Sequence, residues 1–70
     1  MTNFEKTIVG TLTQIKVTGE NENKMVLLTK FKGEKSWAVQ TFKYGETFHD
    51  CYFVKTMKAA KEDASGFVAR

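Results

Sequence analysis

Within the first 43 positions, stretches that mix apolar and β-branched residues with polar ones are separated by turn residues, as is typical of half-buried β-strands. Phe4 to Val17, which is rich in Thr, Val and Ile, predicts one strand, and Lys24 to Lys32 and Ser36 to Lys43 predict two more. The two segments that join these three strands are GENEN at 19–23 and KGEK at 32–35. They contain the Gly and Asn residues that tight turns favour. The pattern therefore predicts a three-stranded antiparallel meander.

The segment after residue 46 admits two interpretations. We expect a helix from about 51 to 64, with Asp50 as its N-cap and Gly66 at its end. Its apolar stripe would consist of Phe53, Met57, Ala60 and Ala64. The alternative is a fourth strand at 47–55, whose composition is also strand-like. Residues 1–70 are thus expected to form one small α+β domain, a three-stranded or alternatively four-stranded antiparallel meander with one C-terminal helix packed on one face.

The expected sheet has two apolar faces. If the 19–23 turn closes symmetrically, Val17 pairs with Met25; if Gly33 and Glu34 form the second turn, Met25 pairs with Phe42. The first face then carries Val9, Ile15, Val17, Met25, Leu27, Phe31, Ala38 and Phe42. The second carries Ile8, Leu12, Val26, Leu28, Trp37 and Val39, interspersed with Gln14, Lys16, Lys30, Lys32, Lys35 and Lys43.

One helix can cover only one of these faces, and soluble monomers rarely expose large apolar patches. We expect the helix on the first face, because that face carries fewer charges. Trp37 would then lie on the open side, directly across from Lys30. A one-residue slip in either turn reverses this assignment, and Trp37, Leu28, Val26 and Val39 would then form the core, with lysine stems extending from its rim.

Size and cysteine content limit how the domain is stabilised. A chain of 70 residues buries a thin core, which a disulfide, a metal or a second subunit often reinforces. The single cysteine, Cys51, excludes an intramolecular disulfide, and with His49 as the only histidine it cannot complete a protein-only zinc site. A homodimer or another partner therefore remains open, and we expect no cofactor.

Positive charge is concentrated in one segment. The net charge is +3, but residues 24–43 carry five lysines against Glu34, or +4, and the remaining residues carry six basic side chains against seven acidic ones, or −1.

No apolar run resembles a signal peptide or a membrane span. These features favour the cytoplasm of a cell, or of an infected host, as the location.

Catalysis is not expected. His49 and Cys51 are the only candidates for a nucleophile and its base, and no pattern supplies an oxyanion hole. The five glycines form no phosphate-binding loop, and the carboxylates are dispersed. Asp50 is best explained as a helix cap.

The expected function is binding through the basic face that contains Trp37. The candidate residues are Trp37, Lys30, Lys32, Lys35, Lys43, Lys16, Val39 and Leu28. One hypothesis is a small inhibitor or adaptor, of the kind phages encode, that docks on an acidic or nucleic-acid-handling protein through a tryptophan ringed by polar groups. The alternative is a sequence-tolerant nucleic-acid-binding module, because lysines attract phosphates and exposed rings stack on bases. The scarcity of arginine argues against base-specific readout.

Overall fold

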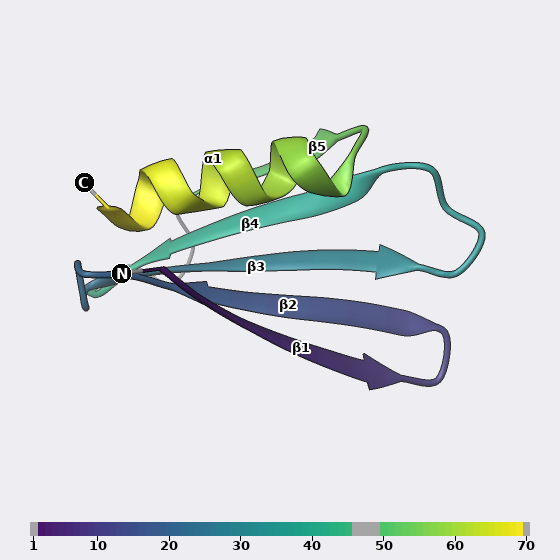
Figure 1. The fold of residues 1–70 in the computed structure, drawn as a ribbon, viewed down its shortest axis with the longest axis horizontal. Coiled ribbons are helices and arrows are strands. Elements are labelled where there is room, and N and C mark those ends of the chain that lie inside the picture. The colour runs from purple at the N-terminus through teal and green to yellow at the C-terminus, as the bar shows by residue number, and fades with distance from the viewer. Residues whose placement is uncertain (1, 46–49, 70) are drawn as a thin grey trace.

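The structure is a computed structural model that describes residues 2–45 and 50–69. Each strand pairs antiparallel with the next, so the order across the sheet follows the chain. The described residues confirm an α+β meander with a C-terminal helix, but the sheet has five strands instead of three or four (Figure 1). The elements are β1 (Asn3–Val9), β2 (Leu12–Thr18), β3 (Lys24–Phe31), β4 (Trp37–Lys43), β5 (Asp50–Val54) and α1 (Met57–Ala69).

The single strand expected over Phe4–Val17 is in fact two strands. Gly10 adopts a φ of 59°, and Val9 pairs with Leu12 across a two-residue turn formed by Gly10 and Thr11. Glycine at the first central position of a two-residue hairpin is a known preference, because a side chain there would be strained. β1 therefore folds back along β2 and becomes the edge of the sheet.

The expected helix over 51–64 is wrong in its position. Asp50–Val54 forms β5, which pairs with β4, so the alternative of an additional strand is confirmed for these residues; 47–49 lie outside the described residues. Asp50 is not a helix cap. The hydroxyl of Thr56 accepts a hydrogen bond from Ala59 N–H at 3.1 Å and caps α1, which continues through Gly66 to Ala69.

On β3 and β4 the helix covers the opposite face from the one we expected, whereas Ile15 and Val17 of β2 lie in the core under the helix, as expected. Val17 pairs with Val26 instead of Met25, whereas the expected pairing of Met25 with Phe42 is confirmed. The one-residue difference in the first hairpin brings the helix-facing residues of β2 onto the same side as Trp37. The buried core consists of Ile15, Val17, Val26, Leu28, Trp37, Val39, Ala60, Ala64 and Val68.

The register shift has its origin in the connection between β2 and β3. Lys24 N–H donates to the backbone oxygen of Asn21 at 3.1 Å, and Asn23 N–H donates to the side-chain oxygen of Asn21 at 3.0 Å. Asn21 N–H in turn donates to the backbone oxygen of Val68 in α1 at 3.2 Å. This local turn makes the connection one residue longer than a symmetric closure, so every later side chain of β3 changes face relative to β2.

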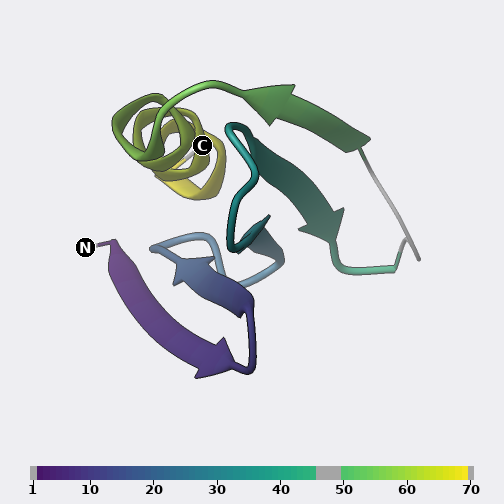
Figure 2. The same cartoon turned by 90° about the vertical axis from the view of Figure 1, so that its right-hand side faces the viewer.

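The sheet curls around one side of α1, from β5 to β1 (Figure 2). The helix packs on β2, β3, β4 and β5 but makes no close backbone approach to β1. A helix with its side chains is about 10 Å wide, whereas five strands spaced about 4.8 Å apart span roughly 20 Å or more. The helix is therefore too narrow to shelter the whole face, and the side of β1 that points toward it stays exposed.

We expect Gly19→Ala to destabilise the fold by about 1–3 kcal/mol, the range typical of overpacking. A Cβ on Gly19 would lie 2.6 Å from Val68 Cγ2 and 3.1 Å from the Val68 backbone oxygen. Gly66→Ala is the matched control, since a Cβ there meets nothing within 4 Å, and it should stabilise the helix by about 0.5–1 kcal/mol. Urea unfolding measures both; an unchanged midpoint for Gly19→Ala would contradict the close packing of the loop on α1.

Candidate basic groove

A groove runs between α1 and β1 on the helix side of the sheet. The side chains of β1 that point toward α1 are Phe4, Lys6 and Ile8, which pair with Val17, Ile15 and Thr13 of β2. Phe4 is 42 % exposed and Ile8 is 63 % exposed, although both are apolar and lie beside the core. The groove is thus a concave, partly apolar surface that the helix leaves uncovered.

At the end of the groove near the start of α1, a hollow of about 300 Å³ opens toward the turns between strands. Its lining residues are Lys6, Ile8, Gly10, Thr11, Thr13, Lys30, Phe31, Lys32, Trp37 and Met57. Three of these ten are lysines, and none of the described lining residues is acidic. The hollow therefore combines positive charge with an apolar floor.

Different elements bring these lysines together. Lys6 comes from β1 and Lys30 from β3. Lys32 is held by its backbone N–H, which donates to the oxygen of Thr11 in the first hairpin turn at 2.7 Å. Glu34 N–H donates to the oxygen of Phe31 at 3.0 Å, which closes a turn with Gly33 at a φ of 93°.

Two lysines of the groove lie against aromatic rings. Lys30 Nζ lies 5.9 Å from the ring centroid of Trp37, and Lys61 Nζ of α1 lies 5.3 Å from that of Phe4. Ammonium groups at this distance are attracted by the ring quadrupole. These contacts hold positive charge over the groove and leave part of the Phe4 ring accessible. We call Phe4, Lys6, Ile8, Thr13, Lys30, Lys32, Trp37, Met57 and Lys61 the basic groove.

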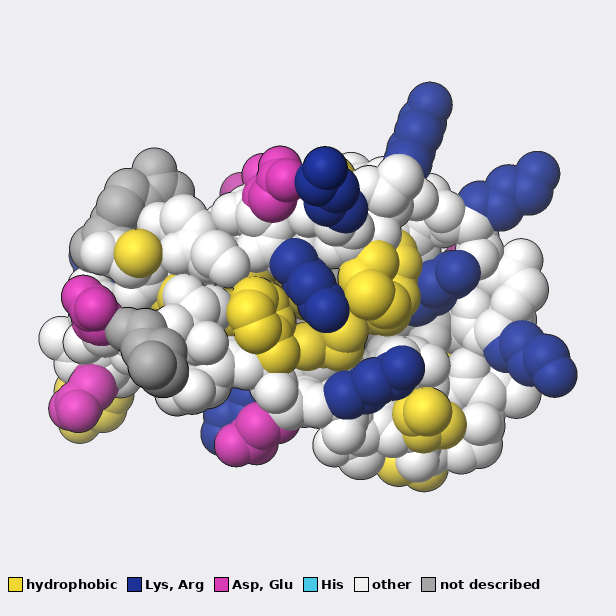
Figure 3. All heavy atoms as spheres, in the orientation of Figure 1, with side chains coloured by type: hydrophobic (Ala, Val, Ile, Leu, Met, Phe, Trp, Pro, Cys, Tyr) yellow, Lys and Arg dark blue, Asp and Glu magenta, His cyan; other side chains and the backbone are white. Residues whose placement is uncertain are grey.

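The two ends of the molecule differ in charge. Residues 30–35 and 55–58, at the groove end, contain five lysines and one glutamate. Figure 3 shows lysines spread around the exposed apolar side chains and over one end, and acidic side chains mainly toward the other. The fold therefore turns a modest net charge of +3 into a local positive field around the groove.

The assignment of Trp37, Leu28 and Val39 to an open face is wrong. Trp37 is 5 % exposed, and Leu28 and Val39 have no exposed surface. They lie under α1 because the first hairpin pairs one residue later than expected. The second interpretation, in which these side chains form the core with lysines at its rim, is the one the structure bears out.

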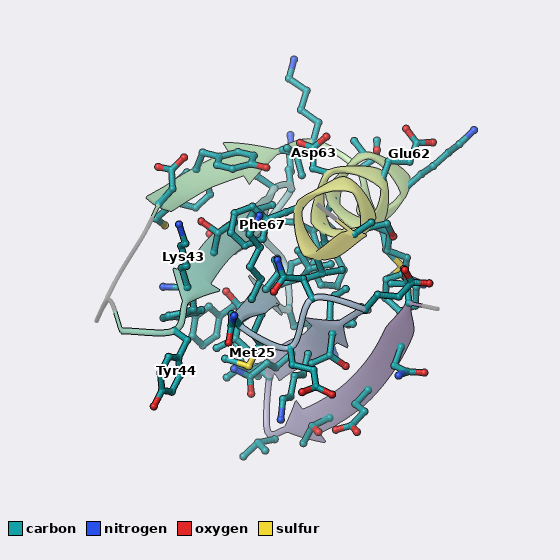
Figure 4. All side chains as sticks on the ribbon, turned by 90° about the vertical axis from the view of Figure 1, so that its left-hand side faces the viewer. Met25, Lys43, Tyr44, Glu62, Asp63 and Phe67 are labelled. Atoms are coloured by element: carbon teal, nitrogen blue, oxygen red, sulfur yellow. The ribbon has the colours of Figure 1, made fainter. Side chains whose placement is uncertain are left out.

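The five predicted lysines do not form one cluster. Lys30 and Lys32 line the hollow, and the expected proximity of Lys30 to Trp37 is confirmed. Lys35 is exposed in the loop after Gly33, and Lys16 is exposed on the sheet face away from α1. Lys43 is exposed at the opposite end of β4, beside Tyr44 and Met25 (Figure 4).

Sequence reasoning missed the parts of the groove that come from β1 and α1. Phe4, Lys6 and Ile8 are every second residue of β1, so they point to the same side of the sheet. Recognition of the turn at Gly10, directly after this strand, would have placed them together. Lys61 follows Met57 by four residues, one helical turn, once the helix is taken to begin after Thr56.

A second hollow, of about 680 Å³, lies near the C-terminal half of α1 and is acidic. Asp50, Glu62 and Asp63 are among its lining residues, and Tyr52 donates a hydrogen bond to Asp63 Oδ2 at 3.2 Å. In Figure 4, Asp63 and Phe67 lie on one side of α1 and Glu62 lies on the other. Carboxylates repel phosphate, so an anionic ligand is directed to the opposite end of the molecule.

The structure adds little to the possible catalytic chemistry. Cys51 is exposed, and its backbone N–H donates to Asp50 Oδ1 at 2.8 Å. His49 lies outside the described residues. Among the residues that are described, no three His, Cys, Asp or Glu side chains are grouped so that they could hold a metal ion.

Comparisons with family models, with curated proteins and with solved structures gave no match for this chain. Within residues 2–45 and 50–69, no helix is long and apolar enough to cross a membrane. The function must therefore be inferred from the groove and the surfaces around it.

We expect Trp37→Ala to lower the free energy of unfolding by about 3–5 kcal/mol, the usual loss when a buried tryptophan is truncated. That is a large fraction of the stability of a small domain. Tyr44→Ala is the control, because Tyr44 is 85 % exposed and its removal should change stability by less than about 0.5 kcal/mol. Denaturant unfolding followed by circular dichroism measures both. A fully stable Trp37→Ala protein would contradict the core position of the indole.

Proposed function

We propose that this protein is a non-enzymatic binder of single-stranded nucleic acid and that the ligand lies in the basic groove. One observation carries the proposal. Lys30 and Lys61 lie over aromatic rings along a concave surface, and the described residues that line its hollow include no acidic side chain. Phosphates would contact Lys6, Lys30, Lys32 and Lys61.

Single-stranded nucleic acid fits this arrangement better than a duplex does. The ring of Phe4, which lies next to Lys61, is 42 % exposed. Stacking on such a ring requires bases that are not already stacked within a helix. Lysine contributes point charges without the planar, bidentate geometry of arginine, so binding is expected to tolerate many sequences.

The salt dependence of binding provides the first test. Four phosphate contacts predict that the logarithm of the association constant falls with the logarithm of salt concentration with a slope of about −2.8. Lys30→Gln with Lys32→Gln should reduce the slope to about −1.4. Fluorescence anisotropy of labelled single-stranded oligonucleotides of several sequences measures both values.

The matched control is Lys24→Gln with Lys43→Gln, which removes the same charge outside the groove and away from the face opposite α1. It should leave the slope nearly unchanged. An equal loss in both double variants would mean that net charge alone drives binding, and no binding at about 50 mM salt would exclude the proposal.

Phe4→Leu tests stacking separately from charge. Leucine keeps an apolar side chain at this position but removes the ring, so affinity should fall about fivefold or more while the salt slope stays constant. The same anisotropy titrations report both quantities. An unchanged affinity would mean that the ring of Phe4 does not contact bases.

An acidic protein surface is the second candidate ligand, with the chain acting as an adaptor or inhibitor. The exposed Ile8 and the half-buried Met57 favour it, because an acidic amphipathic segment would cover apolar side chains while its carboxylates met the lysines. Retained binding to such a partner by a protein that binds no oligonucleotide would support this candidate over the first.

A further inference from the structure

The side of the sheet opposite α1 is not covered by any described element (Figure 2). The strand registers place alternate residues of all five strands on this face. We call it the open face; it consists of Asn3, Glu5, Thr7, Val9, Leu12, Gln14, Lys16, Thr18, Met25, Leu27, Thr29, Phe31, Ala38, Gln40, Phe42, Cys51 and Phe53. About half of these side chains are apolar.

The apolar residues of the open face lie next to one another across strands. Val9, Leu12 and Phe31 form a row at one end, and Met25 pairs with Phe42 near the other. Val9 and Phe53, on the two edge strands, are 68 % and 71 % exposed. Apolar side chains thus reach both ends and both edges of the open face, although Thr7, Gln14 and Thr29 lie between the two rows. Exposed apolar surface of this extent is expected of an interface.

The charge of the open face indicates what covers it. Its only charged residues are Glu5 and Lys16, which are cross-strand neighbours of opposite sign. The face is therefore neutral, although the chain carries a net charge of +3. A neutral apolar surface gives no electrostatic advantage to nucleic acid or to an acidic protein, but it matches another neutral apolar surface.

The size of the open face is sufficient for a dimer. Five strands spaced about 4.8 Å apart, five to eight residues long and rising about 3.3 Å per residue, give a projected area of about 500 Å². Two copies whose faces overlap fully would bury about 1,000 Å², which is the lower bound for a specific interface. In such a two-fold contact, each copy presents Glu5 and Lys16, one charge of each sign, to the other copy.

From these observations we infer that the open face binds a second copy of this chain, which forms a two-fold symmetric dimer. The contact buries the apolar rows of both sheets and adds a second apolar layer to a domain whose own core is only one layer thick. This inference does not depend on the proposed nucleic-acid binding, because the basic groove lies on the other side of the sheet.

Size-exclusion chromatography with light scattering, from about 10 to 500 µM, tests the inference. The mass should approach twice the 8.0 kDa of the chain, and it should not change between about 50 and 500 mM salt, because the interface is neutral. Val9→Glu and Phe53→Glu should each weaken dimerisation at least tenfold, since each places an unpaired carboxylate in the interface. Circular dichroism should show that both variants remain folded.

Ile8→Glu is the matched control. Ile8 is the neighbour of Val9 in β1, is similarly exposed at 63 %, and points to the opposite side of the sheet. This variant should dimerise like the wild type. A wild-type protein that stays monomeric at 500 µM overturns the inference. A dimer that survives both Val9→Glu and Phe53→Glu, or that is lost in Ile8→Glu, also overturns it.

Discussion

The packing of one narrow helix on one side of a wider sheet determines every surface of this protein. Ala60, Ala64 and Val68 lie along α1 and have no exposed surface. Their small size brings the helix close to Val26 and Leu28 of β3. Because this contact is narrower than the sheet, β1 extends beyond the helix on the covered side, and no element within residues 2–45 and 50–69 covers the opposite side. Both the basic groove and the open face follow from that difference in width.

Strand-like composition and turn residues predicted a meander and the positions of β3 and β4, but they did not predict which side of these two strands the helix covers. Side chains change sides with every residue, so one additional residue between Val17 and Val26 reverses the assignment of a whole strand. The additional residue belongs to the turn at Asn21. The backbone N–H of Asn21 donates a hydrogen bond to Val68 in α1, which is a tertiary contact. A local pattern contains no information about such a contact.

The site was predictable in its chemistry and only partly in its location. The association of Lys30 with Trp37 followed from the second hairpin, whose register was correct. Lys6 and Lys61 could not be placed, because one required the turn at Gly10 and the other required the true start of the helix at Met57. The lysine-rich segment at 24–43 thus supplies only half of the lysines of the groove, and the other two come from residues distant in the sequence.

The basic groove and the neutral open face lie on opposite sides of the sheet, which makes the two proposed interactions compatible. The groove contains lysines on one side of the sheet, while the open face carries no net charge on the other. In a dimer joined through the open faces, the two grooves would point away from each other. A single strand long enough to reach both grooves would bind the second at a high effective concentration, so its avidity would exceed the affinity of either groove. A neutral interface is suited to this arrangement, because high salt would release the nucleic acid without separating the subunits.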